Sequence, residues 1–223
     1  MRRPLTATKN AGLNSSQLDR LVSEAVNLFY LHGYDKVSIQ DIVDTLGLTK
    51  GAFYYYLQSK EEILFLVHDR IVTYSLSQIE PTVAGPGSAT ERLAAIISTM
   101  INLVEEYRPY VVVFMDERRR IATDRFQEIA QKRLRYRKQV ESVVADGVRN
   151  GEFLADIDPK MVTLMIFGIV NWTYQWFRSD GRYNVREIGR MCKDVIMEGI
   201  LRRAGPTPAL PGLAPGARVE DTA

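Results

Sequence analysis

The sequence of 223 residues has a single cysteine, Cys192, and only two histidines, His32 and His68. One cysteine cannot form an intramolecular disulfide, and this composition is typical of a protein in a reducing cytoplasm. Neither histidine belongs to a cluster with the spacing of metal ligands, and no glycine-rich phosphate loop or nucleophile elbow is present. We therefore expect no cofactor and no catalytic metal, and the sequence offers little support for an enzyme.

Long apolar runs are also missing. The basic N-terminus is not followed by the apolar stretch of a signal peptide, and no apolar span is long enough to cross a membrane. We expect a cytoplasmic protein without a membrane partner. An excess of one charge is missing too, since 29 basic and 27 acidic residues give a formal net charge of +2. Any affinity for nucleic acid must then come from the local placement of charge.

The most informative stretch is Val37–Glu62, which predicts two short helices joined by a tight turn, with a third helix behind them. Ser38 and Asp41 form a capping pair for the first helix. Gly47 supplies the positive φ that ends this helix, and Thr49 caps the next one. These signals predict a helix-turn-helix motif.

The second helix of this motif has an unusual outward face. Phe53 and Leu57 can point inward, which leaves small residues, hydroxyl groups and a lysine outside. Gly51 permits close approach of the backbone, and hydroxyl and ammonium groups can reach base edges and phosphates. This face therefore suits the major groove of DNA. The alternative is an ordinary helical hairpin in which the tyrosines are packing residues.

The segment from Ser38 to Glu62 resembles the N-terminal DNA-binding domain of the TetR family of transcriptional repressors. The residues that carry the resemblance are Asp41-Ile42-Val43, Gly47-Leu48-Thr49-Lys50-Gly51, Phe53-Tyr54-Tyr55-Tyr56 and Ser59-Lys60-Glu61. Leu57 and Gln58 stand where the family commonly has an aromatic residue and a proline, but both keep the pattern of burial. The expected DNA contacts are Ser38, Thr49, Lys50, Gly51, Tyr54, Tyr55, Tyr56 and Lys60.

The rest of the chain predicts helices only, with repeated capping signals and no strand alternation. The fold class is all-α, with an N-terminal three-helix helix-turn-helix domain and a C-terminal helical ligand-binding and dimerisation domain. Residues 1–13 are expected to be a disordered basic arm or a plain flexible terminus, residues 14–60 the DNA-binding domain, residues 61–203 the second domain, and residues 204–223 a disordered tail. Helix starts are expected at Ser16, Ser59, Ser88, Pro109, Asp124, Asp158 and Asn184, and helix ends at Gly33, Glu80, Arg120 and Asn150-Gly151.

The last two predicted helices carry apolar faces in a domain that already has enough core. In a symmetric dimer, two helices from each subunit can pack as a four-helix bundle, with Val195 and Ile200 in the interface. The alternative is that these faces complete the core of the monomer. The TetR resemblance implies the homodimer, and its two recognition helices would enter successive major grooves of a palindromic operator in double-stranded DNA.

A second resemblance concerns the C-terminal domain. Asn171-Trp172, Trp176-Phe177-Arg178 and the Asp116-Glu117-Arg118 region resemble a TetR subgroup that regulates fatty-acid and related lipid catabolism and binds acyl-CoA thioesters. Tryptophans four residues apart on a helix share a face and can wall an acyl tunnel, while guanidinium groups suit phosphates. Core packing of the tryptophans and a solvated basic face are the alternatives. The expected ligand residues are Arg118, Arg119, Arg120, Arg135, Asn171, Trp172, Trp176 and Arg178.

These observations predict a homodimeric repressor that an acyl-CoA effector releases from its operator. The effector would shift the population between two spacings of the DNA-binding domains by moving the helix from Ser59 to about Glu80. A regulator that senses another apolar or aromatic small molecule is the first alternative. A helical enzyme with a DNA-binding domain is the alternative from another class, and turnover of a thioester would distinguish it.

Overall fold

The computed structural model describes residues 13–118, 120, 123–178 and 180–201, without the side chains of residues 13–16 and 123–126. The expected basic arm, apart from Leu13, and the expected tail lie outside these residues. Throughout the described part of the chain the regular elements are helices, and the only β contact is an isolated bridge between Phe153 and Leu201. The all-α prediction is confirmed.

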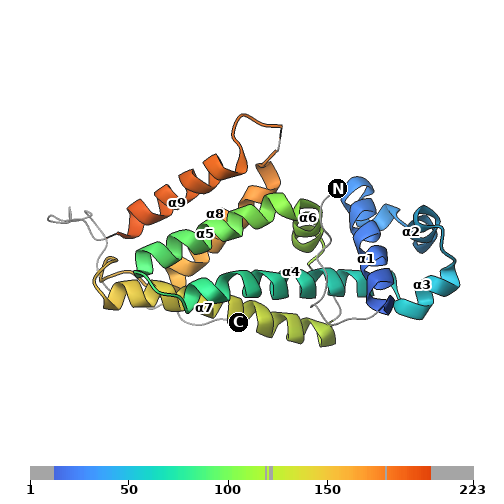
Figure 1. Ribbon diagram of the computed structural model, residues 1–223, viewed down its shortest axis with the longest axis horizontal. Helices are drawn as coiled ribbons and strands as arrows, with labels where there is room; N and C mark the ends of the chain where they lie inside the picture. The colour runs from blue at the N-terminus through green and yellow to red at the C-terminus, as the bar shows by residue number, and fades with distance from the viewer. Residues whose placement is uncertain (1–12, 119, 121–122, 179, 202–223) are drawn as a thin grey trace.

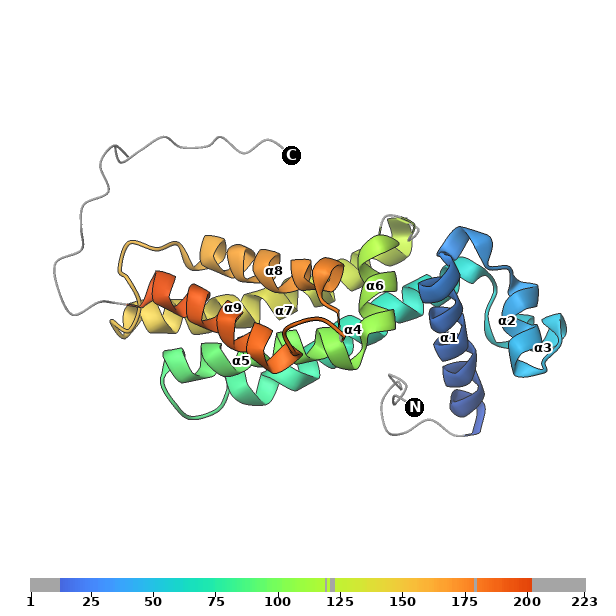
Figure 2. The ribbon, with the colours of Figure 1, turned by 90° about the horizontal axis from the view of Figure 1, so that it is seen from above.

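A small N-terminal part, called the head below, stands at one end of the molecule (Figure 1). It consists of α1 (Leu13–His32), the short 3-10 helix η1 (Tyr34–Lys36), α2 (Ile39–Leu46) and α3 (Lys50–Tyr56). The remaining helices form the body: α4 (Lys60–Val83), α5 (Ala89–Glu106), α6 (Arg108–Asp116), α7 (Thr123–Arg149), α8 (Pro159–Trp176) and α9 (Val185–Ile200). Helix α4 leaves the head and runs along the body, and α6 lies beside α1 (Figure 2).

The head has the local structure that its capping residues predict. Ser38 Oγ accepts a hydrogen bond from the backbone N–H of Asp41 at 3.2 Å, and the Ser38 N–H donates to the Asp41 carboxylate at 2.7 Å. Gly47 ends α2 with φ 66°, a left-handed conformation that favours glycine, and Thr49 caps α3. Phe53 is fully buried and anchors α3 to the other head helices.

The structure corrects several predicted helix limits. Pro81 does not end α4, because a proline in the last turn removes only one hydrogen bond and Ala84 N–H still bonds to Glu80 O at 3.1 Å. Ser59 caps α4 as predicted, and the Glu62 carboxylate accepts a hydrogen bond from the N–H of Gln58, the residue before the cap, at 2.7 Å. Helix α1 begins at Leu13, before the expected Ser16, and α6 begins one residue before Pro109 and ends at Asp116 instead of Arg120. Helix α7 begins at Thr123, one residue before the expected Asp124. Helix α8 ends at Trp176, so Phe177 and Arg178 lie beyond it.

Helix α5 forms the centre of the body and packs against α4, α7, α8 and α9. Leu93, Ile96 and Ile97 are fully buried, so this helix is covered on more than one side. The Ser88–Glu91 and Asn184–Glu187 capping boxes and the Asp158 cap before Pro159 are formed as predicted. Among the described residues, no helix is both long and apolar enough to span a bilayer.

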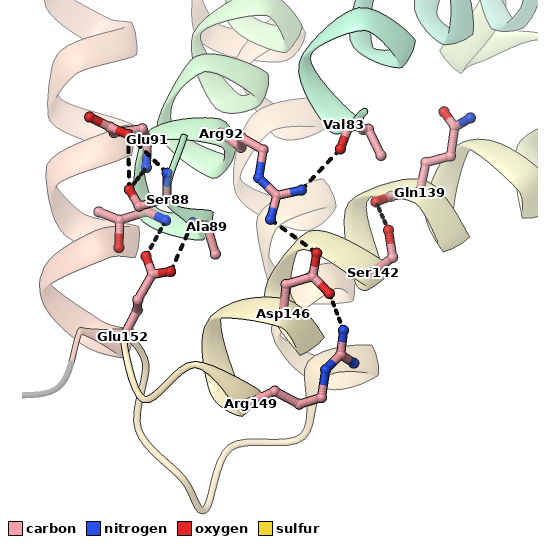
Figure 3. Close-up of polar contacts among 11 residues, drawn as sticks. Val83, Ser88, Ala89, Glu91, Arg92, Gln139, Ser142, Asp146, Arg149 and Glu152 are labelled. Atoms are coloured by element: carbon pink, nitrogen blue, oxygen red, sulfur yellow. Dashed lines mark hydrogen bonds and ion pairs between the residues drawn. The ribbon is translucent and has the colours of Figure 1, made fainter. Parts of the chain in front are cut away.

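The end of α4 farthest from the head is fixed by polar contacts to α5 and α7 (Figure 3). The guanidinium of Arg92 donates to Val83 O and to the Asp146 carboxylate, each at 3.0 Å. The Glu152 carboxylate accepts from the first N–H groups of α5, at 3.0 Å from Ala89, and so meets the positive end of that helix. The C-terminal end of α4 is therefore held in place, whereas its N-terminal end carries the head.

Candidate DNA-binding face and ligand cavity

Helix α3 presents an exposed face at the tip of the head. Lys50, Gly51, Tyr54 and Tyr55 are exposed, and the Tyr55 side chain is 73% accessible. Tyr56 is half-buried, and its ring meets that of Tyr55 edge-on at 4.9 Å between centroids. The structure thus brings most of the predicted DNA contacts to one surface.

Gly51 is not required by the packing of the head. A Cβ atom added there would meet only Thr49 Oγ1, at an ordinary distance of 3.6 Å. A glycine inside a helix destabilises it by about 1 kcal/mol relative to alanine. The described residues therefore give no packing reason for a glycine at this position, and its small size leaves room for the close approach of an external surface.

Three of the predicted DNA-contacting residues have structural partners in the head. The Ser38 and Thr49 hydroxyl oxygens are occupied as helix caps. The Lys60 ammonium donates to Tyr34 O at 2.8 Å and to Val37 O at 2.9 Å, and it lies 4.0 Å from the centre of the Tyr34 ring. Two of its three N–H groups therefore bond within the protein, which leaves one for a phosphate.

The head is joined to the body by contacts of α1 with α4 and α6. Arg70 on α4 forms a buried ion pair with Asp19 on α1 at 2.6 Å. Arg108 at the start of α6 donates to the Tyr30 hydroxyl at 3.3 Å. These contacts join α4 and α6 directly to α1, the helix on which the helix-turn-helix rests.

A cavity of about 460 Å³ lies in the body between α4, α5, α6, α7 and α8. This volume is within the range of small-molecule sites in proteins. Its polar lining residues are Ser75, Arg133, Tyr136, Arg137 and Asn171. The remaining lining residues are apolar: Ile71, Val72, Met100, Leu103, Val104, Val111, Phe114, Met115, Ala130, Leu134, Leu164 and Phe167.

Positive charge gathers at one part of this cavity. Arg133 lies 5.8 Å from the centre of the Phe114 ring, and both burial and the nearby charge of Arg118 lower the pKa of its guanidinium. The Nε atom of Arg137 is buried without a hydrogen-bond partner in the described structure. Arg133 and Arg137, four residues apart on α7, both line the cavity, and guanidinium groups of this kind suit an anion.

His68 lies on α4 close to the Phe114 wall of the cavity. It is fully buried, its ring is 4.4 Å from the Phe114 ring between centroids, and neither ring nitrogen has a hydrogen-bond partner among the described residues. Burial, and secondarily the charge of Arg133, lower the pKa of His68 from 6.5 to about 3. The folded protein therefore holds this imidazole in its neutral form at physiological pH.

The structure places only part of the predicted ligand set at the cavity. Asn171 lines it, whereas Arg118 is absent from the lining and only lies close enough to Arg133 to lower the pKa of that guanidinium. The expected position of the tryptophans needs correction, because Trp172 and Trp176 are absent from the lining and are 63% and 50% exposed on another side of α8. Sequence reasoning named Asn171 but not Arg137, which lies on the same face of α7 as Arg133, four residues away.

The other predicted arginines have carboxylate partners. Arg120 pairs with Asp35 of the head at 2.7 Å, Arg135 with Glu80 at 2.8 Å, and Arg178 with Asp180 at 2.9 Å. None of these three lines the cavity. Arg119 lies outside the described residues.

An apolar stripe runs along the outer surface of α8 and α9, and we call it the outer stripe. Val195 is 68% exposed, whereas Ile200, which was expected beside it, is buried in the monomer core. An exposed apolar surface of this kind is typical of a protein interface. The outer stripe consists of Met161, Met165, Ile169, Trp172 and Trp176 on α8 with Met191 and Val195 on α9.

Comparison with known proteins agrees with this architecture. Residues 86–200 match the family described as "Tetracyclin repressor-like, C-terminal domain", and residues 21–67 match "Bacterial regulatory proteins, tetR family". The HTH-type transcriptional repressor KstR2 of Mycobacterium tuberculosis is 24% identical over 193 residues, which cover 86% of this chain and 96% of that protein. The fatty acid metabolism regulator protein of Bacillus subtilis is 22% identical over 182 residues, covering 81% of this chain and 94% of that protein.

Solved structures show the same fold. The structure of KstR2 from M. tuberculosis superposes with a TM-score of 0.79 at 22% identity, covering 90% of this chain and 100% of that one. AibR, solved in complex with isovaleryl coenzyme A and operator DNA, gives a TM-score of 0.72 at 24% identity and covers 78% of this chain and 95% of that one.

A helix-turn-helix head on a helical body defines a DNA-binding regulator of transcription. The two domain matches show, more particularly, that the chain belongs to the TetR family of transcriptional regulators. Its domains and relatives are those of a repressor-type regulator and not of an enzyme.

Proposed function

We propose that the protein is a homodimeric repressor whose operator binding is relieved by an acyl-CoA thioester of lipid catabolism. The observation that carries this proposal is the body cavity, where apolar walls meet the guanidinium groups of Arg133 and Arg137. An acyl-CoA has the same division between an apolar chain and anionic phosphates. The names of the relatives support the choice, since they include a fatty acid metabolism regulator, a ketosteroid regulator and a protein solved with isovaleryl coenzyme A.

The acyl chain lies among the apolar walls, where each buried methylene contributes about 0.8 kcal/mol. The phosphates of coenzyme A meet Arg118, Arg133 and Arg137. Arg120, Arg135 and Arg178 already have carboxylate partners and are weaker candidates for this role. Asn171 supplies a neutral amide that can bond to the thioester or pantetheine part.

The outer stripe forms the dimer interface in this proposal. Its apolar residues lie on two neighbouring helices, so a two-fold axis beside them brings four helices together and buries both copies of the stripe. Trp172 and Trp176 then become interface residues rather than ligand residues. The same symmetry presents two copies of α3 to successive major grooves, about 34 Å apart, of a palindromic operator in the cytoplasm.

Ligand binding acts on DNA through α4. This helix lines the cavity with Ile71, Val72 and Ser75, its far end is fixed at Val83, and its near end carries the head. A ligand that fills the cavity displaces the near end, because the far end is held by Arg92. The spacing of the two heads then changes, and the population with operator-compatible spacing falls.

The proposal is tested by calorimetric titration of the protein with acyl-CoAs of increasing chain length. Affinity should rise with chain length until the cavity is filled, while free coenzyme A and the free acid each lack one set of contacts and should bind weakly. Binding of the free acid as tightly as its thioester would reject the coenzyme A part. No response to any thioester would favour another apolar or aromatic small molecule, for which Phe114, Tyr136 and Phe167 offer ring contacts.

A further inference from the structure

A second pocket of about 190 Å³ adjoins the body cavity between α4 and α5. The two spaces share four lining residues, Ser75, Met100, Leu103 and Tyr136, which form a partition between them. The partition contains two hydroxyl groups in an otherwise apolar wall. The end of a ligand in the large cavity therefore meets hydrogen-bonding groups wherever it reaches this partition.

The second pocket differs in chemistry from the arginine side of the cavity. Tyr74, Gln78, Thr99 and Asn102 line it with neutral hydroxyl and amide groups, and its one charged lining residue is the acidic Glu106. No lysine or arginine is among its described lining residues. A carboxylate or phosphate is disfavoured in such a space, whereas a hydroxyl or carbonyl oxygen is suited to it.

The Tyr136 side chain is placed to read such an oxygen. Its ring packs edge-on against Phe167 at 5.2 Å between centroids, and burial raises the pKa of its phenol, so the hydroxyl stays protonated. The adjacent Ser75 hydroxyl donates to Ile71 O at 2.8 Å and is the side-chain hydrogen-bond partner of the Tyr136 phenol, whose oxygen keeps a lone pair as an acceptor. A ligand hydroxyl can donate to this phenol oxygen, which a purely hydrocarbon chain cannot do.

We propose that the acyl group of the effector carries a neutral hydroxyl group, remote from the thioester, that donates a hydrogen bond to the Tyr136 phenol oxygen at the partition. This inference rests on the proposed function, because it takes the arginine side of the cavity as the coenzyme A end. The ligand then has three parts in order: phosphates at the arginines, an apolar middle, and a polar outer group at the partition.

The experiment compares octanoyl-CoA with octanoyl-CoA hydroxylated at the last, penultimate or antepenultimate carbon, by calorimetry on the full-length protein. The parent should bind one hydroxylated form about tenfold more tightly than the plain thioester, the effect of one buried hydrogen bond. Tyr136→Phe should lose this preference, because its ring still packs on Phe167 but carries no oxygen. Tyr183→Phe, outside both spaces, is the matched control and should retain the preference.

Two outcomes would overturn the inference. In one, every hydroxylated thioester binds no better than octanoyl-CoA, which means that the protein binds the acyl group through apolar contacts alone. In the other, Tyr136→Phe keeps the preference, so another group reads the oxygen. In both cases thioester binding itself, and with it the proposed function, stands. If neither plain nor hydroxylated thioesters bind, the proposed function fails and this inference fails with it.

Discussion

The head and the body place their functional groups in opposite ways. In the head, the helices pack around Phe53, and the groups for recognition stand outward on α3, a helix of seven residues. In the body, the helices leave a cavity of about 460 Å³, and the groups for recognition point inward from five helices. In the proposed function, the head therefore recognises DNA through a short continuous segment, whereas the body recognises its ligand through residues that only the tertiary fold brings together.

The largest effect is expected at the outer stripe, which belongs to neither recognition site and which we propose as the interface between two copies of the chain. Val195→Glu would bury an unpaired charge in the proposed interface, at a cost of several kcal/mol. Sedimentation should show monomers with the helical content of the parent, and operator affinity should collapse because one head remains. Val195→Ala removes bulk without adding charge and should stay dimeric. A Val195→Glu protein that sediments as a dimer would exclude this interface.

The next effect concerns the pH dependence of stability, to which a buried histidine of the body contributes. Because folding lowers the pKa of His68 to about 3, its protonation favours the unfolded chain. Its contribution to stability is complete above the ordinary pKa of 6.5 and is lost as pH falls towards 3, by about 1.4 kcal/mol for each pH unit. Chemical denaturation of His68→Leu between pH 7 and pH 4 should show a flatter loss of stability than the parent.

The matched control for this experiment is His32→Leu, which removes an exposed histidine from the end of α1. It should follow the pH dependence of the parent. Equal slopes for the parent and His68→Leu would contradict the assignment of a buried neutral imidazole next to Phe114.

A smaller effect tests whether the exposed glycine of α3 lowers the stability of the protein. Gly51→Ala fits the head without a clash, so it should raise the free energy of unfolding by up to about 1 kcal/mol. The added methyl group should at the same time weaken operator binding, because it stands between α3 and the groove. Thermal unfolding and mobility-shift titration measure the two effects. A variant with both greater stability and unchanged operator affinity would remove Gly51 from the DNA face.

The smallest effects are expected from the lysines of the head. Lys50→Ala should lower the slope of log affinity against log salt by about one, since this lysine is exposed and free to meet a phosphate. Lys60→Ala should change the slope less and reduce affinity mainly by loosening η1, because the Lys60 ammonium bonds to Tyr34 O and Val37 O. Equal slope changes for both variants would show that Lys60 also neutralises a phosphate fully.

The same comparison explains what the sequence could predict. The helix-turn-helix depends on neighbours within four residues, so Ser38, Gly47 and Thr49 predicted its limits correctly. The ligand site depends on which face of α8 turns inward. Both faces are apolar, with Ile166 buried and Met165 exposed, so periodicity could not show that Asn171 faces the cavity and Trp172 the outside. Nor could the sequence show which arginines lack carboxylate partners.

The central claim is that charge at the cavity couples an acyl-CoA to release of DNA, and Arg133→Met tests it most directly. The protein is bound to an operator selected in vitro from random duplexes, and octanoyl-CoA is titrated in a mobility-shift assay. The parent should release the operator, while Arg133→Met should bind the operator equally well and need at least about tenfold more thioester for release, the loss of one charge-assisted contact. Arg182→Met, outside the cavity, should behave as the parent. If the Arg133→Met protein released the operator at the same thioester concentration as the parent, the account would be contradicted.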